Sequence, residues 1–143
     1  MKAFFDTSVL IAIFYAHHRF HQASIDLFLR FKKSEACCGV HSLAEIYSSL
    51  TGRMGGERVS GDEAMLFIGD VRERLTVVSL NEQEYFKALE ESAAIGIVGG
   101  AIYDALLAHS ALKAKARTIY TWNMKDFVRL GPEIAGRVRT PAE

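Results

Sequence analysis

Short apolar segments alternate along the chain with longer segments in which apolar residues recur every three or four positions. The short segments predict buried strands at residues 2–5, 36–39, 76–79, 118–121 and 137–140. The longer segments predict helices at residues 9–15, 23–32, 43–50, 62–73, 81–94, 102–114 and 124–130. Strands that alternate with helices favour an α/β fold, in which helices cover both faces of a parallel sheet.

The segments between these elements carry their own signals. Asn81 and Glu84 have the spacing of a capping box, which predicts that a helix begins there. Residues 54–61 contain three glycines and are the most loop-like part of the chain. Residues 96–100 are also glycine-rich, but they lack the lysine and hydroxyl ending of a P-loop, so we predict a plain turn. Because no repeat or linker interrupts the pattern, we expect residues 1–143 to form a single domain.

The charge of the chain is balanced, with 17 Lys and Arg against 17 Asp and Glu. The net charge therefore does not indicate a nucleic-acid-binding protein, and such a role would need a local basic patch. The candidates for a basic rim, each of which is equally compatible with ordinary surface charge, are Arg53, Arg58, Lys113, Lys115 and Arg117.

The cysteines and the apolar runs indicate the cellular compartment of the protein. Cys37 and Cys38 are neighbours in a predicted strand and point to opposite faces, so we expect two buried reduced thiols. The longest apolar run, residues 9–16, is well short of the roughly 18 residues that a membrane-spanning helix needs. We therefore expect a cytoplasmic protein with no contact with a membrane.

Four acidic residues stand where predicted strands give way to helices: Asp6, Glu45, Asp104 and Asp126. In open α/β sheets, ligands bind outside the carboxyl ends of the strands, which is the edge where these transitions occur. Carboxylates that meet there repel one another unless a cation lies among them. The pattern therefore predicts a divalent metal site that performs phosphate chemistry.

Three of these acids also have a purely structural interpretation. Asp6 has the position of a helix N-cap. Ser42 and Glu45 have capping-box spacing, and Asn123 and Asp126 repeat a similar arrangement. For these acids the residues alone leave both interpretations open.

Asp104 differs from the other three acids, because its helical neighbours Leu107, Ala108, Ala111 and Leu112 form an apolar face. A carboxylate on such a face is costly to bury without a partner. The basic residues of this helix lie at its far end, so a metal ion is the favoured partner. A rival ligand set, His17, His18 and His21, lies next to Arg19 and Gln22 and is better explained as solvated surface.

The motifs that contain these acids resemble those of the PIN domain family, and most of all its VapC-type ribonuclease toxins. They are residues 6–10 (DTSVL), residues 44–46 (AEI), residues 103–108 (YDALLA) and residues 121–127 (TWNMKDF). The resemblance implies a three-layer α/β/α sandwich with a mostly parallel five-stranded sheet. It also implies that Asp6, Glu45 and Asp104 bind Mg²⁺ or Mn²⁺.

The fourth acidic position is less regular in the resembled family. Some members carry an acid two residues after the threonine, where this chain has Asn123. Here Asp126 supplies the fourth catalytic charge, or it only caps a helix. The residues expected to give polar support to the site are Thr7, Ser8, Thr121 and Asn123.

The function implied by the resemblance is a metal-dependent endoribonuclease, the toxin of a type II toxin–antitoxin pair. It would hydrolyse RNA phosphodiesters with metal-activated water, bind a cognate antitoxin and form a homodimer. The alternatives are a PIN-fold nuclease of RNA processing without a toxin role, and a non-catalytic module that binds a metal or a partner. A haloacid-dehalogenase-type phosphohydrolase is disfavoured, because it needs a second Asp where Ser8 stands.

Overall fold

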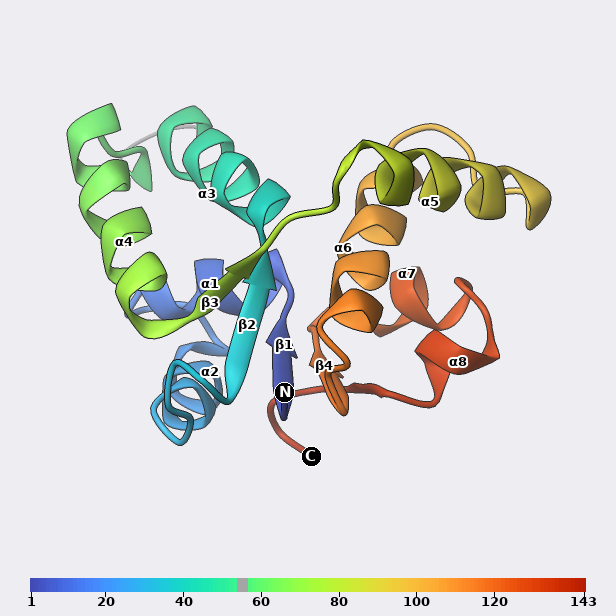
Figure 1. Ribbon diagram of the computed structural model, residues 1–143. Coiled ribbons are helices and arrows are strands. Elements are labelled where there is room, and N and C mark those ends of the chain that lie inside the picture. Colours follow the sequence, from blue (N-terminus) through green and yellow to red (C-terminus); the bar gives the residue numbers. More distant parts are fainter. Residues whose placement is uncertain (54–56) are drawn as a thin grey trace.

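The computed structural model describes residues 1–53 and 57–143. A five-stranded sheet with the order β3-β2-β1-β4-β5 forms its centre, and all four strand pairings are parallel. The expected three-layer α/β fold is thus confirmed, with a sheet that is parallel throughout the described residues (Figure 1). The elements are, in chain order, β1 (Ala3–Phe5), α1 (Thr7–Phe14), α2 (His21–Phe28), β2 (Ala36–Gly39), α3 (Val40–Gly52), α4 (Gly61–Arg74), β3 (Thr76–Val78), α5 (Glu82–Ala94), α6 (Ala101–Lys113), β4 (Thr118–Tyr120), α7 (Met124–Val128), α8 (Pro132–Ala135) and β5 (Val138–Arg139).

The two faces of the sheet bury separate hydrophobic clusters. Phe5 and Cys38 face a cluster that includes residues of α1, α2, α3 and α4, whereas Phe4 and Cys37 face a cluster built with α6, α7 and α8. Neighbouring strand residues point in opposite directions, which explains this division. In Figure 1, α1 to α4 lie on one side of the sheet and α5 to α8 on the other.

All five predicted strands are present, but some helix boundaries differ from the prediction. Helix α1 begins at Thr7 and helix α3 at Val40, in each case directly after the strand or after one capping residue. The short helix α8 was not predicted, because four residues are too few to show helical periodicity. It begins at Pro132, after Gly131 with a φ of 117°.

The glycine-rich segments agree with their predictions where the structure describes them. Gly96 and Gly99 have φ values of 79° and 60°, in the left-handed region that turns require. The predicted loop at residues 54–61 lies partly outside the described residues, and its last residue before α4, Ser60, is the N-cap of that helix. The capping box of Asn81 and Glu84 opens α5 as predicted.

Both cysteine thiols are free and buried, as expected. Burial raises the pKa of each thiol to about 12, so neither is a thiolate near neutral pH. None of the helices in residues 1–53 and 57–143 has the length and apolarity of a membrane span.

Candidate active site

The four predicted acids all lie toward the edge of the sheet where its strands end, the upper edge in Figure 1. Asp6 directly follows β1, and Asp126 lies in the first turn of α7, a few residues after β4. Glu45 lies in the second turn of α3, and Asp104 lies in the first turn of α6. Because the strands are parallel, their carboxyl ends bring residues from distant parts of the chain to one edge.

Asp6 is buried, with 2% of its surface exposed, and it caps α1. Its Oδ2 accepts hydrogen bonds from the Ser8 hydroxyl (2.7 Å) and from the Thr121 hydroxyl (2.7 Å). Burial raises the pKa of Asp6, and these hydrogen bonds only partly offset that effect. The capping interpretation is therefore confirmed, and the same side chain also lies at the acidic edge.

Glu45 does not close a capping box, so that alternative is wrong. Helix α3 begins at Val40, with Gly39 as its N-cap, and Ser42 therefore lies inside the helix. The Glu45 Oε1 instead accepts a hydrogen bond from the Thr7 hydroxyl (2.7 Å), which also bonds to the Ser42 hydroxyl (2.8 Å). Burial raises the pKa of Glu45, and the charge of Asp6 raises it further.

Asp104 shows most directly that the acids share one region. Its pKa is raised to about 7, first by burial and then by the charges of Asp6, Asp126 and Glu45. The positive charge of the Arg129 guanidinium lowers the pKa of Asp104. Since like charges shift a pKa only when they lie near one another, Asp104 lies within electrostatic range of the other three carboxylates.

Asp126 and Asn123 differ from the predicted capping pair. Asn123 occupies the N-cap position of α7, but its side chain makes no capping hydrogen bond. Its backbone N–H donates to the Thr121 hydroxyl (2.9 Å), while Asp126 pairs with Arg129 at 3.6 Å. The Asn123 amide is thus not committed to holding the helix, and it is exposed at the same edge.

The chemistry of this donor set fits Mg²⁺ or Mn²⁺, because both ions prefer carboxylate oxygens. Within the described part of the chain, no three His, Cys, Asp or Glu side chains are already arranged as a ready-made metal site. One oxygen of Asp6 is held by two hydroxyls, and one oxygen of Glu45 by Thr7.

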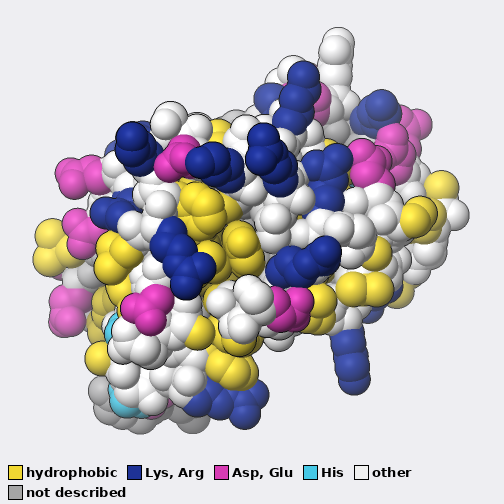
Figure 2. Space-filling model, turned by 90° about the horizontal axis from the view of Figure 1, so that it is seen from below, with side chains coloured by type: hydrophobic (Ala, Val, Ile, Leu, Met, Phe, Trp, Pro, Cys, Tyr) yellow, Lys and Arg dark blue, Asp and Glu magenta, His cyan; other side chains and the backbone are white. Residues whose placement is uncertain are grey.

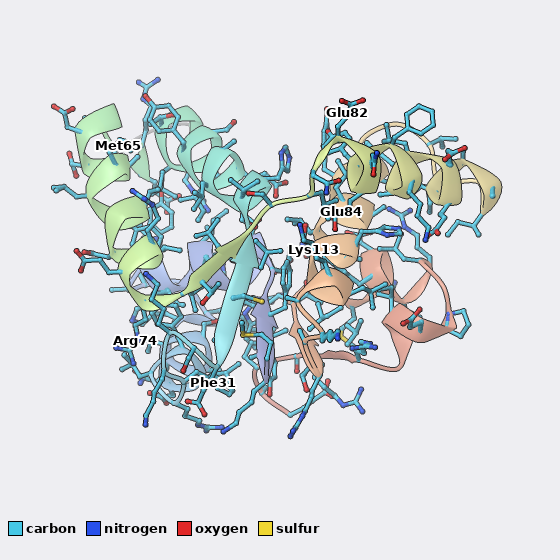
Figure 3. The ribbon with its side chains drawn as sticks, viewed as in Figure 1. Phe31, Met65, Arg74, Glu82, Glu84 and Lys113 are labelled. Carbon is cyan, nitrogen blue, oxygen red and sulfur yellow. The ribbon has the colours of Figure 1, made fainter. Side chains whose placement is uncertain are left out.

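Three of the residues expected to form a basic rim lie elsewhere, so that prediction is wrong for them. Lys113 is nine residues along α6 from Asp104, and its ammonium donates to the Ser79 carbonyl and to Glu84, both at 2.7 Å (Figure 3). Lys115 and Arg117 lead into β4 and therefore lie at the edge where the strands begin.

The edge where the strands begin is basic. In the view from below the sheet, Lys and Arg side chains gather on this face (Figure 2). Residues that precede strands account for this distribution: Lys2, Lys32, Lys33, Arg74, Lys115, Arg117 and Arg137. A chain with no net charge is therefore polarised, with acids concentrated where the strands end.

The predicted surface histidines are only partly solvated. His17 is exposed and lies 2.9 Å from Glu57, whereas His18 and His21 are half-buried. The His18 ring accepts a hydrogen bond from the Phe20 N–H, and the His21 ring lies 3.0 Å from the Ala12 carbonyl. They do not form a metal site within the described residues.

The sequence interpretation missed two aromatic pairs beside the acids. The rings of His41 and Tyr103 stack at 4.9 Å and connect α3 to α6 next to Glu45. The rings of Phe20 and Trp122 stack at 3.8 Å on the other side, next to Ser8. Tyr103 and Trp122 belong to the motifs at residues 103–108 and 121–127, but nothing in the sequence indicated their stacking partners.

The fold and the acidic edge define an α/β protein with a clustered carboxylate site, and one family model describes it. The PIN domain model matches residues 3–131, so the chain belongs to the PIN domain family. A search of curated protein sequences gives no match to the chain.

Solved structures of this fold include three bacterial proteins. VapC20 of Mycobacterium tuberculosis, described as a toxin that cleaves the sarcin–ricin loop, is 17% identical, with a TM-score of 0.70 over 87% of this chain and 92% of that chain. VapBC2 of Rickettsia felis, bound to a DNA fragment from its promoter, is 17% identical, with a TM-score of 0.67 over 98% of each chain. VapBC-1 of nontypeable Haemophilus influenzae is 19% identical, with a TM-score of 0.68 over 100% of each chain.

Proposed function

We propose that residues 1–143 form a single endoribonuclease domain that depends on a divalent metal and acts as the toxin of a type II toxin–antitoxin pair. The observation that supports this most strongly is the set of neighbouring carboxylates, in which burial and then the charges of the other acids raise the pKa of Asp104 to about 7. Such a cluster costs free energy unless a cation neutralises it. Membership of the PIN family and the fold shared with VapC20 support the nuclease interpretation.

We assign the metal to Asp6, Glu45 and Asp104. A bound Mg²⁺ or Mn²⁺ supplies an activated water and a positive charge that offsets the charge developing on the phosphate. Thr7 keeps Glu45 oriented through its 2.7 Å hydrogen bond. Ser8 and Thr121 do the same for one oxygen of Asp6, which leaves its other oxygen for the ion.

Asp126 completes the catalytic set in this proposal. The charge of Asp126 raises the pKa of Asp104. The ion pair of Asp126 with Arg129 at 3.6 Å limits the movement of the carboxylate. Asn123 presents an exposed amide rather than a carboxylate at the same edge, which suits contact with the substrate. The expected products of hydrolysis are a 5′-phosphate and a 3′-hydroxyl.

A toxin of this kind requires partner proteins. An antitoxin that covers the acidic site is expected to place a basic side chain among the carboxylates, because their charges favour a cation. The exposed apolar side chains on α5, Tyr85, Phe86 and Leu89, offer a surface to a second copy in a homodimer. Size-exclusion chromatography with light scattering measures this association directly.

The nuclease assignment is tested by RNA cleavage in the presence of Mn²⁺. Asp6→Asn and Asp104→Asn should each abolish cleavage while leaving the circular dichroism spectrum unchanged. Asp70→Asn, an exposed acid on α4, is the matched control and should retain activity. Retained cleavage in both site variants would remove the assignment, and Mn²⁺ binding by calorimetry without cleavage would favour a non-catalytic module.

The toxin role has its own test. Expression of the protein should arrest bacterial growth, and the arrest should be relieved by the small protein encoded next to its gene. An active nuclease whose expression has no effect on growth would instead indicate an enzyme of RNA processing.

A further inference from the structure

A hollow of about 320 Å³ lies close to Asp6 and is lined by Ser8, Ile11, His18, Arg19, Phe20, Trp122 and Asn123. Ser8 is part of its wall and connects it to the site. The Ser8 hydroxyl donates to Asp6 Oδ2 at 2.7 Å and accepts from the backbone N–H of Trp122 at 3.0 Å. A molecule in this hollow is therefore separated from the carboxylate cluster by a single residue.

The wall of the hollow is a rigid stack of flat groups. The rings of Phe20 and Trp122 lie 3.8 Å apart and within 7° of parallel. The guanidinium of Arg19 lies over the Phe20 ring, 4.4 Å from its centroid. The indole N–H of Trp122 donates to the fully buried Ser24 hydroxyl at 2.9 Å, which fixes the orientation of the stack.

Among the described residues that line this hollow, Arg19 carries a permanent positive charge and none is acidic. Burial lowers the pKa of His18, and the nearby charges of Arg53 and Arg19 lower it further. The lowered pKa favours the neutral form of His18, so the positive charge at the hollow is that of Arg19. A phosphate is attracted to such a region, whereas the carboxylate cluster alone repels it.

Asn123 adds a group that can distinguish one base from another. It lines the hollow, is exposed, and makes no capping hydrogen bond with its side chain. An amide side chain offers both donors and an acceptor to the edge of a base. Unpaired bases of RNA stack on aromatic rings and on arginine planes, and their edges are then free for hydrogen bonding.

We propose that this hollow binds the nucleotide adjacent to the cleaved bond of a single-stranded RNA, with its base on the Arg19 face of the stack and its edge contacted by Asn123. The inference rests on the proposed nuclease function, to which it adds the position of one nucleotide and a residue that determines base preference. Paired RNA is excluded from the hollow, since its bases are already stacked and hydrogen-bonded.

Trp122 is the single tryptophan of the chain, so tryptophan fluorescence arises from the wall of this hollow. A short single-stranded RNA, titrated in the presence of EDTA to prevent cleavage, should quench this fluorescence to saturation. Arg19→Ala should weaken the affinity about tenfold, the scale of one lost base stack. Arg72→Ala removes an exposed arginine from the last turn of α4 and should leave the affinity unchanged. A duplex of the same sequence should quench weakly.

A second measurement addresses specificity. With Mn²⁺ present, Asn123→Ala should cleave RNA with a relaxed base preference at the position next to the cut. Absence of quenching, or equal weakening by Arg19→Ala and Arg72→Ala, would overturn the proposal. Quenching that depends on Arg19 without any cleavage by the unaltered protein would support the RNA-binding hollow while refuting the nuclease assignment. Cleavage by the unaltered protein without such quenching would refute the RNA-binding hollow while supporting the nuclease assignment.

Discussion

Replacing Asp104 by Asn should stabilise the protein at high pH in the absence of a divalent metal. The pKa of Asp104 rises from its ordinary value of 3.8 to about 7 in the folded chain. Between these values the folded protein retains a proton that the unfolded chain has lost, so stability falls as the pH rises. Above about pH 7 the full cost of the ionised carboxylate is present.

The size of this effect follows from the shift. Three pKa units correspond to about 4 kcal/mol as an upper bound. Asp104 is only half-buried, so solvent screening reduces this cost, and we expect about 1–2 kcal/mol. The asparagine has nearly the same shape but no charge, so the repulsion that Asp6, Asp126 and Glu45 exert at this position is removed.

The measurement is urea unfolding of both proteins in EDTA at about pH 5 and about pH 8.5. Asp104→Asn should exceed the unaltered protein in free energy of unfolding at the higher pH, and the difference should shrink at the lower pH. The exposed Asp70→Asn is the control and should show no such dependence. A variant that is equally stable or less stable at the higher pH would show that Asp104 carries no repulsive charge.

Three further outcomes follow from the same structure. Metal-dependent RNA cleavage should decline as the pH falls below about 7, because a proton then competes with the ion for Asp104; a pH-rate profile measures this. Thr7→Val should lower kcat about tenfold with little change in fold, because Glu45 loses its 2.7 Å hydrogen bond; an unchanged kcat would contradict the positioning role. Gly39→Ala should cost about 1–3 kcal/mol in thermal or urea unfolding, since the added Cβ would lie 2.7 Å from Cδ2 of the buried Leu107.

Much of the fold could be predicted from the sequence because its signals are local. The alternation of short and long apolar segments located all five strands, and the spacing of Asn81 and Glu84 located the start of α5. Helix boundaries were less accurate, since Ser42 resembles a cap but lies inside α3. Helix α8 was missed because its four residues leave no periodic pattern.

The candidate site could likewise be predicted only in part. Asp6, Glu45, Asp104 and Asp126 could be identified because each lies at a transition between elements. The partners of these acids could not, because contacts between distant residues leave no spacing pattern in the sequence. Lys113 is an example, since only the folded chain shows that its ammonium donates hydrogen bonds to the Ser79 carbonyl and to Glu84.

The sequence by itself determined the succession of strands and longer helices along the chain. It also placed acids after or near the strand ends, because these properties depend on residues a few positions apart. Only the tertiary structure decided that Thr7 holds Glu45, 38 residues away, and that Phe20 stacks on Trp122. It also decided the raised pKa of Asp104. Burial and the distances between charges arise only when the parallel strands bring remote segments to one edge.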